Sequence, residues 1–452
     1  MSRMGLIACH DCDLLQRETV LPRGATALCR RCGAELYRDR SATIDRTLAW
    51  ALAATIFFIM ANAFPILGLK VNDTIVHTTL WGAGVLLYRD GMWPVSALVF
   101  ATTLLMPALE ILAVLYLLVP LKFKLAAPRR HLAYRVLQLA RPWSMTEVLI
   151  VGVLVALVKL VHIASVVPGV GLWALGAAMI SLAAMAAAFD PRTVWRHGGS
   201  TGAAVAGTAA AQPARTPATA CATAPAPASA SAPASASTLA PALVTPAPTA
   251  ARAGLFTCHV CGLLCAAPAP AHEGDCPRCG ARVHFRKPDS IARTWAFLVA
   301  AMVLYIPANL LPIMNTSSLF GAQHDTILSG VVYLWVSGSW PLAIVVFVAS
   351  IAVPMLKILA LMFLVISARM RMRGMSRRNT RIYRMLEFIG PWSMLDIYVI
   401  AVLVALVQFS ALATIKAGPA AIAFGAVVVL TMLAARSFDP RLQWDQSEKR
   451  HV

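Results

Sequence analysis

The stretch Gly338–Val365, GSWPLAIVVFVASIAVPMLKILALMFLV, occurs a second time in this chain in altered form. Its counterpart, Gly91–Leu118, reads GMWPVSALVFATTLLMPALEILAVLYLL. Both copies begin with Gly-x-Trp-Pro, and both exceed the roughly 20 apolar residues that a helix needs to cross a bilayer. Each contains one charged residue at the same position, Glu110 or Lys357. Because a charge in a membrane-spanning helix costs roughly 2.5–3.5 kcal/mol on insertion scales, we expect it to have a function.

The composition is that of a polytopic membrane protein. Of the 452 residues, 59% are hydrophobic and only 13% are charged, whereas about a quarter of the residues of a soluble domain are charged. The amino-terminal region is polar and contains cysteines, so no signal peptide is expected there. The net charge of +19 does not indicate nucleic-acid binding, because the basic residues cluster at the ends of the apolar segments and set membrane topology.

Four apolar segments in the first half predict four membrane-spanning helices. They are Thr47–Leu69, Trp93–Val119, Met145–Val167 and Leu172–Phe189. Only Pro168-Gly169 separates the last two well-defined runs, which predicts a tight turn and a helical hairpin. The segment Asp73–Tyr88 is too broken to span a bilayer, so we expect an external loop with a short interfacial helix.

The second half repeats this plan. Trp93 recurs as Trp340, 247 residues later, and Pro142 of a Pro-Trp-Ser-Met motif recurs as Pro391, 249 residues later. The Asn-x-x-Pro motif at Asn62 and the Phe-Asp-Pro-Arg motif at Phe189 also recur, at Asn309 and Phe438. A shift of two residues over this distance indicates an internal duplication.

The distribution of Lys and Arg predicts the topology. The loop between the second and third apolar segments contains six such residues, and the matching loop of the second half contains seven. The loop between the first and second segments contains only Lys70 and Arg89. The positive-inside rule therefore places both termini in the cytoplasm. With four spans and the same charge bias in each half, the repeats are predicted to be parallel, related by an axis along the membrane normal.

Two cysteine motifs predict two metal-binding ribbons. Each has the form C-x2-C, a gap of sixteen or fourteen residues, then C-x2-C, and this spacing lets four thiolates surround one zinc ion. The ligands are Cys9, Cys12, Cys29 and Cys32 in the first ribbon and Cys258, Cys261, Cys276 and Cys279 in the second. Two Zn²⁺ per chain are expected, and iron in a rubredoxin-like site fits the same ligands. Disulfides would need an oxidising compartment, against the predicted cytoplasmic location.

A long segment between the halves consists almost wholly of Ala, Pro, Thr and Ser, which predicts a disordered linker. It contains Cys221, expected to be a free thiol, and Cys265 beyond it is either an alternative ligand of the second ribbon or a bystander. The predicted boundaries are 1–40 for the first ribbon, 41–197 for the first four helices, 198–253 for the linker, 254–286 for the second ribbon and 287–452 for the second four helices. The predicted fold is an all-α polytopic membrane protein of two parallel tandem repeats, each a cytosolic zinc ribbon followed by four helices.

A ribbon, four spans with Asn-x-x-Pro and Pro-Trp-Ser-Met, and then the same series again resemble the paraquat-inducible protein A family of bacterial inner-membrane proteins. The resemblance covers both halves and excludes only the Ala/Pro-rich linker. It implies a periplasmic partner that contains MCE domains, and trafficking of phospholipid or another membrane lipid between the inner and outer membranes. Composition and spacing alone show only a membrane protein with two metal ribbons.

Polar residues within the apolar segments are candidates for a transport site. Ser350 precedes Lys357 by two helical turns on the same face. Ser393, Asp396 and Thr431 of the following helices could reach the same depth. We therefore predict a buried cluster of Ser350, Lys357, Ser393 and Thr431, four positions that the resemblance also marks as important. The alternative is that Lys357 only extends its amine to the membrane surface.

Glu110 occupies the position of Lys357 in the first half, so the two could pair across the halves. Alternatively, Glu110 pairs within its own half with Lys159 or His162. Glu147 begins a helix directly after Pro-Trp-Ser-Met, where a carboxylate stabilises the helix amino terminus. The same interpretation applies to Asp396. The asparagines of the two Asn-x-x-Pro motifs are expected to hydrogen-bond to backbone groups that the nearby proline leaves without a helical partner.

No hydrolase elbow, phosphate loop or paired-histidine motif is present, so an enzyme is not expected. The resemblance to the family instead implies the membrane component of a lipid-transport system, in which proton movement through groups such as Lys357 could supply energy. The alternatives are a membrane sensor or assembly factor with protein-binding ribbons, and a redox protein that uses the C-x2-C pairs. Stoichiometric metal would exclude the redox protein, and co-purification of an MCE-domain protein would favour transport over sensing.

Overall fold

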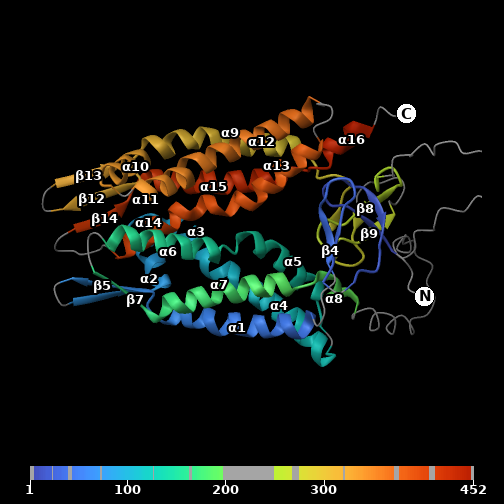
Figure 1. Ribbon diagram of the computed structural model, residues 1–452, viewed down its shortest axis with the longest axis horizontal. Coiled ribbons are helices and arrows are strands. Elements are labelled where there is room, and N and C mark those ends of the chain that lie inside the picture. The colour runs from blue at the N-terminus through green and yellow to red at the C-terminus, as the bar shows by residue number, and fades with distance from the viewer. Residues whose placement is uncertain are drawn as a thin grey trace, which may run out of the picture.

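The computed structural model describes residues 5–22, 24–38, 43–71, 74–125, 127–161, 165–196, 249–266, 274–318, 321–338, 340–370, 376–406 and 413–448. Within these residues, eight helices are long and apolar enough to cross a membrane, four in each half. The two halves lie side by side as helical bundles, and two small strand-containing units adjoin one end (Figure 1). The predicted fold class is therefore confirmed.

The first repeat consists of eight helices, two helical turns and three strands. They are α1 (Thr43–Ala63), β5 (Leu67–Val71), β6 (Thr74–Thr78), α2 (Leu80–Arg89), α3 (Trp93–Phe100), η1 (Ala101–Leu105), α4 (Met106–Phe123), α5 (Arg130–Ala140), η2 (Arg141–Trp143), α6 (Thr146–Val161), β7 (Ser165–Pro168), α7 (Val170–Ala188) and α8 (Pro191–Arg196). The helices α3 and α4 form one continuous span with η1 between them.

The second repeat contains the same elements in the same order. They are α9 (Ser290–Leu310), β12 (Met314–Ser318), β13 (Gly321–Asp325), α10 (Ile327–Val336), α11 (Trp340–Phe347), η3 (Val348–Ala352), α12 (Val353–Arg369), α13 (Ser376–Ile389), η4 (Gly390–Met394), α14 (Leu395–Leu406), β14 (Ala413–Ala417), α15 (Pro419–Ser437) and α16 (Leu442–Glu448). Corresponding elements of the two repeats run the same way along the long axis (Figure 1), which confirms the parallel duplication.

The ends of the first and third apolar segments were wrongly predicted as helix. The first helix ends at Ala63 because Pro65 disfavours helical geometry in the residue before it, and β5 follows. The third segment likewise ends in β7, which is rich in β-branched residues, and not in the predicted tight turn. β5 pairs antiparallel with both β6 and β7, and β12 pairs with β13 and β14 in the same way. Both sheets lie at the end of the bundles opposite the ribbons (Figure 1).

A close backbone contact joins each sheet to the last long helix of its repeat. The amide of Gly169 donates to the carbonyl of Ile66 at 2.9 Å, and a Cβ on Gly169 would lie 2.2 Å from the carbonyl oxygen of Pro65. In the second repeat, a Cβ on Gly418 would lie 2.1 Å from the carbonyl oxygen of Pro312. Only glycine permits these approaches, which hold α7 against α1 and α15 against α9.

A π-helical turn interrupts the duplicated span at the same place in both repeats. These turns, η1 and η3, directly precede Pro107 and Pro354. A proline cannot donate to the carbonyl four residues before it, so the extra residue of a π turn relieves the clash between ring and backbone. Both repeats therefore accommodate the proline in the same way.

The repeats meet along α6 and α14. The tyrosine Tyr398 of α14 is completely buried, and its Cβ lies 2.9 Å from the position that a Cβ on Gly152 of α6 would take. The hydroxyl of Tyr398 also bonds to Oγ1 of Thr102 in η1, at 3.0 Å. The interface therefore places the π turn of the first repeat in contact with a helix of the second.

Each ribbon consists of two short antiparallel hairpins. The strands are β1 (Leu6–Ala8), β2 (Leu15–Arg17), β3 (Thr26–Leu28) and β4 (Glu35–Arg38) in the first ribbon, and β8 (Leu255–Thr257), β9 (Leu264–Ala266), β10 (Gly274–Asp275) and β11 (Arg282–Val283) in the second. The ribbons pack on each other through Ala8, Ala250 and Leu255, and Leu14 bridges to Thr249. The last residues assigned to the linker, 249–253, thus pack against the first ribbon, while Cys221 lies outside the described residues.

The glycine contact predicts that Gly169→Ala destabilises the protein by about 3 kcal/mol, the upper range for overpacking, because the new methyl group meets a backbone carbonyl that cannot turn away. Thermal unfolding in detergent measures the loss. The control is Gly330→Ala in α10, where no atom lies within 4 Å of the added Cβ and alanine favours the helix. Unchanged unfolding of Gly169→Ala would contradict the close approach.

Candidate metal centres and polar site

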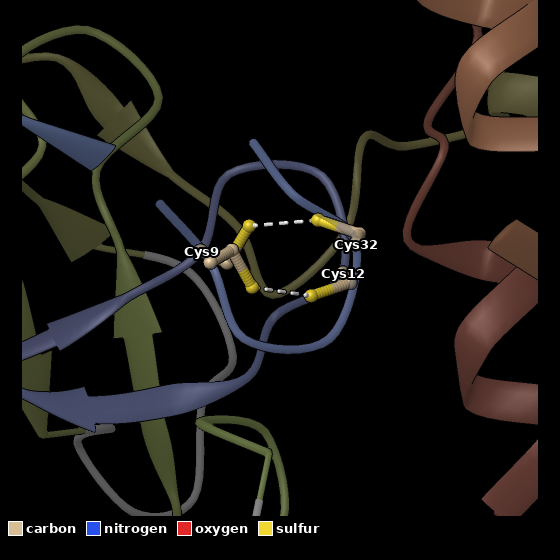
Figure 2. A group of neighbouring side chains, drawn as sticks. Cys9, Cys12 and Cys32 are labelled. Atoms are coloured by element: carbon tan, nitrogen blue, oxygen red, sulfur yellow. Dashed lines mark hydrogen bonds between the residues drawn. The ribbon is translucent and has the colours of Figure 1, made fainter. Parts of the chain in front are cut away.

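The four cysteines of the first ribbon converge on one point. Sγ of Cys9 lies 3.5 Å from Sγ of Cys32, and Sγ of Cys12 lies 3.5 Å from Sγ of Cys29 (Figure 2). All four sulfur atoms lie within 4.8 Å of one another, and all four residues are buried. The second ribbon repeats the arrangement, with 3.5 Å between Cys258 and Cys279 and between Cys261 and Cys276.

Residues with a left-handed backbone conformation shape the turns that carry these cysteines. Gly33, Gly262 and Gly280 each follow the second cysteine of a C-x2-C pair and have φ values of 72°, 70° and 61°. The fourth turn has Asp13 at this position, with φ 61°. An aspartate tolerates this conformation better than most residues, although glycine is favoured. Its side chain has a separate role, described below.

The sulfur positions fit a tetrahedral metal. Four sulfurs about 2.3 Å from a zinc ion would lie about 3.8 Å from one another, close to the observed spacing. A disulfide requires about 2.05 Å, so the cysteines are not paired as disulfides in the described structure. Each group of four cysteines could therefore hold one metal ion.

The predicted polar cluster lies inside the second repeat. Ser350, Lys357, Ser393 and Thr431 are each at most 2% exposed, so the amine of Lys357 does not extend to the surface. Lys357 and Ser393 meet at a single acceptor, the carbonyl of Gly390, to which Nζ donates at 3.3 Å and Oγ at 2.8 Å.

The other two hydroxyls bond to their own helices. Oγ of Ser350 donates to the carbonyl of Val346 at 2.6 Å, and Oγ1 of Thr431 donates to Val428 at 2.9 Å. Their elements, η3 and α15, each contact η4, and α15 also packs against α12. The structure therefore gathers the elements that carry the four residues, and it brings Lys357 and Ser393 together directly. Asp396 lies in the first turn of α14, and its side chain is outside the described residues.

The predicted pair between Glu110 and Lys357 is wrong. The carboxylate of Glu110, only 6% exposed, pairs within its own repeat with Nε of Arg141 at 3.5 Å. Ser144 bonds to the same carboxylate. The side chains of Lys159 and His162, the other partners considered, lie outside the described residues. Comparison of the two repeats could not identify Arg141 as the partner, because the equivalent residue of the second repeat, 249 residues later, is Gly390.

The two repeats consequently differ at equivalent positions. In the first, a buried carboxylate meets a guanidinium, so the charges compensate each other. In the second, a buried amine meets the neutral backbone carbonyl of Gly390. Among the described side chains, Lys357 has no ion pair, and a buried ammonium without an opposite charge is costly, so the second repeat is the better candidate for a site that changes state.

The remaining polar predictions are structural. Nδ2 of Asn62 donates to the carbonyl of Phe58 at 2.7 Å, and Nδ2 of Asn309 donates to Tyr305 at 2.9 Å, as expected for groups that satisfy backbone near a proline. Glu147 lies in the first turn of α6, where its charge favours the helix amino terminus.

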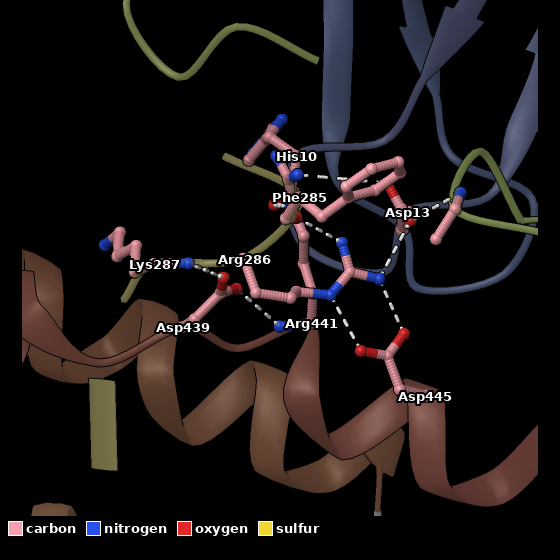
Figure 3. A network of polar contacts seen from close by, with 9 residues as sticks. His10, Asp13, Phe285, Arg286, Lys287, Asp439, Arg441 and Asp445 are labelled. Carbon is pink, nitrogen blue, oxygen red and sulfur yellow. Dashed lines mark hydrogen bonds and ion pairs between the residues drawn. The ribbon is translucent and has the colours of Figure 1, made fainter. Parts of the chain in front are cut away.

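A charged network that the sequence did not predict joins the first ribbon to the end of the chain (Figure 3). Arg286 donates to Asp13 at 2.9 Å and twice to Asp445 of α16, at 2.6 and 2.7 Å. Nε of Arg441 donates to the carbonyl of His10 at 2.9 Å. Burial disfavours the charged Arg286 guanidinium, but the carboxylates of Asp445 and Asp13 outweigh it and raise its pKa. The repeated Phe-Asp-Pro-Arg motif, which contains Arg441, was the available signal for this contact.

Comparison with known proteins agrees with this architecture. The profile of the family described as Paraquat-inducible protein A matches residues 44–198 and 291–448. The Intermembrane transport protein PqiA of Escherichia coli strain K12 is 34% identical over 98% of this chain and 97% of its own length.

Two further relatives are more distant or partial. The Lipophilic envelope-spanning tunnel protein A of the same strain is 28% identical over 97% of this chain and 91% of its own length. A Probable intermembrane transport protein of Haemophilus influenzae is 37% identical over 37% of this chain and 41% of its own length. No solved structure matches the chain.

The geometry of the four-cysteine groups predicts that Cys29→Ser lowers the metal content of the purified protein from two ions per chain to one. The loss also destabilises the first ribbon, because the folding of such ribbons is coupled to metal binding. Elemental analysis measures the ratio. The control is Cys265→Ser, which removes a buried cysteine outside both groups and should leave two ions bound. Metal-free wild-type protein, purified under reducing conditions, would refute the sites.

The ion pair of the first repeat predicts non-additive effects. Glu110→Gln leaves Arg141 without its counter-charge and should cost about 3 kcal/mol, the lower range for breaking a buried pair. The double variant Glu110→Gln, Arg141→Gln should be more stable than Glu110→Gln alone. As a control, Glu110→Gln and Lys357→Met should add, because these residues do not pair. Thermal unfolding of these variants and of the wild type measures the energies, and coupling between Glu110 and Lys357 would contradict the assignment.

Proposed function

The chain belongs to the paraquat-inducible protein A family, and on that premise we propose that it is the inner-membrane component of an intermembrane lipid-transport system. Two of its relatives are named as intermembrane transport proteins and a third as an envelope-spanning tunnel protein, which supports this class of function over a catalytic one. The lipid, a phospholipid or another membrane lipid, would be exchanged with a periplasmic partner that contains MCE domains.

The observation that carries the proposal is the buried amine of Lys357. It lies 1% exposed in a span whose neighbours are apolar, and its described hydrogen bond is to the neutral carbonyl of Gly390. An ammonium there is costly, and a leucine would insert more easily. We propose that Lys357, with Ser350, Ser393 and Thr431, forms the polar site through which lipid exchange is coupled to proton movement. Asp396 would extend this site, while Glu110 forms the ion pair with Arg141 in the first repeat.

The proposed orientation follows from the basic loops and the position of the ribbons. The ribbons lie at one end of the bundles and the two sheets at the other (Figure 1). With the basic loops inside, the ribbons and both termini face the cytoplasm, and the sheets face the periplasm and the MCE-domain partner. Each ribbon would hold one Zn²⁺, bound by the four cysteines named above.

The alternative role, a sensor or assembly factor with protein-binding ribbons, is less well supported. The cysteine-containing core of the first ribbon packs against Trp444, and that of the second packs against Trp195. These ribbon surfaces are therefore occupied by the chain's own helices, which favours an internal role for the ribbons.

The transport proposal predicts that Lys357→Leu is expressed at the wild-type level but fails to restore the envelope barrier in a strain lacking this protein. Ser350→Ala and Thr431→Ala should restore it partially, since each removes one hydroxyl without leaving a charge unpaired. The control is Ser181→Ala, a hydroxyl in α7 that is 2% exposed and bonds to its own helix in the same way. The measurement is survival in detergent at matched expression. Full complementation by Lys357→Leu would rule out the polar site.

A further inference from the structure

The cysteine core of each ribbon packs against the repeat that the ribbon does not precede in the chain, and Arg192 of the first repeat additionally pairs with Glu18 of the first ribbon. Trp444, at the end of the second repeat, is 7% exposed and belongs to the same buried cluster as the four cysteines of the first ribbon. Trp195, at the end of the first repeat, packs with the cysteines of the second ribbon. The two tryptophans are 249 residues apart and each follows Phe-Asp-Pro-Arg by three residues, so the two contacts are equivalent.

An arginine in each ribbon reinforces this crosswise seating. The guanidinium of Arg31 lies 4.5 Å from the ring centroid of Trp444, and that of Arg278 lies 5.7 Å from the ring centroid of Trp195. Each arginine directly precedes the last cysteine of its ribbon. A guanidinium over an indole ring is attractive, so the position of the cysteine turn is linked to the helix end of the opposite repeat.

A second arginine makes the link to the metal centre direct. Arg384 of α13, in the second repeat, donates to Sγ of Cys32 at 3.3 Å and to the carbonyl of Cys32 at 3.3 Å. Its Nε donates to Asp11 of the same ribbon at 2.6 Å. The guanidinium therefore bonds to a sulfur that would be a metal ligand and to the turn that presents two others.

The first repeat has the same arrangement in weaker form. Arg135 of α5 corresponds to Arg384, 249 residues earlier, and its Nη2 lies 3.4 Å from where a Cβ on Gly280 would be. Gly280 directly follows Cys279, the cysteine that corresponds to Cys32. Both helices thus direct an arginine at the last cysteine turn of the opposite ribbon.

α13 leads from this contact to the polar site. Arg384 and Gly390 are separated by six residues, about 9 Å along a helix. The carbonyl of Gly390 is the acceptor shared by Lys357 and Ser393. A shift of α13 along or about its axis would therefore move the backbone carbonyl to which the buried amine bonds in the described structure.

We propose that Arg384 is a positioning residue: it ties the metal centre of the first ribbon to the Gly390 carbonyl beneath Lys357, so that each ribbon sets the geometry of the opposite repeat. This inference rests on the proposed function only for the transport role of the Lys357 site, and not for the contact between the ribbon and α13. A metal in the first ribbon fixes Cys32, Cys32 fixes Arg384, and α13 transmits the position to η4. Loss of that metal, or of Arg384, frees η4 while the second ribbon and the first repeat keep their structure.

Amide hydrogen exchange of the full-length protein in lipid nanodiscs tests this, because it reports on η4 without a transport assay. Cys29→Ser removes the first metal and Cys276→Ser the second. We expect Cys29→Ser to raise exchange in η4 about tenfold and to leave η2 unchanged. Cys276→Ser should have the opposite pattern, with faster exchange in η2 alone. An effect of Cys29→Ser confined to η2 would show that each ribbon serves its own repeat and would overturn the proposal.

Arg384→Gln is a second, independent test, because it removes the arginine while all eight cysteines remain. It should weaken retention of one of the two metal ions about tenfold, the lower range for residues that bond to metal ligands, and should raise exchange in η4. Arg384→Lys should be intermediate, since one amine cannot reproduce three donors. The matched control is Arg381→Gln, an exposed arginine of the same helix. Equal behaviour of Arg384→Gln and Arg381→Gln would refute the positioning role, whatever the outcome for Lys357→Leu.

Discussion

The constraint on which this structure depends is that polar groups inside a bilayer must find partners within the protein. The π turns illustrate it, because the hydroxyls of Thr103 and Ser350 bond to carbonyls one turn earlier in the segments before Pro107 and Pro354. Glu110 satisfies the constraint with a guanidinium. The described partner of the buried Lys357 amine is a neutral carbonyl, not an opposite charge. The place where compensation is incomplete is therefore the place where we locate function.

Duplication supplied two copies of one four-helix plan, and divergence made them unequal. Glu110 and Lys357 occupy equivalent positions, as do Arg141 and Gly390, and these two differences replace an ion pair with an amine that bonds to a carbonyl. The first repeat packs against the second along α6 and α14. It contributes Gly152, which allows the close approach of α6 to α14, and Thr102, which bonds to Tyr398 across the interface.

The ribbons bring the beginning of the chain into contact with its last helix. The first ribbon meets the last helix through Trp444, and Arg286 joins Asp13 to Asp445. Asp13 takes a left-handed position that favours glycine, and its carboxylate is needed for this contact. Charges that are far apart in the sequence are thereby buried together, which places the two candidate metal centres against the ends of both repeats. This arrangement gives the ribbons a way to influence the membrane-spanning helices.

The sequence by itself determined the class, the duplication, the parallel orientation and the two groups of four cysteines, because these depend on composition, spacing and period. It left open whether Lys357 is buried or extends its amine to the membrane surface, and the structure buries it. The sequence did not determine where helices yield to strands, since a run such as Ser165–Pro168 is apolar enough for either and only pairing with β5 selects the strand. Nor could it identify Arg141 as the partner of Glu110, or Arg384 as the partner of Cys32, 352 residues away. Such contacts depend on how helices pack, and only the tertiary structure decided which charges meet and which amine is left with a carbonyl.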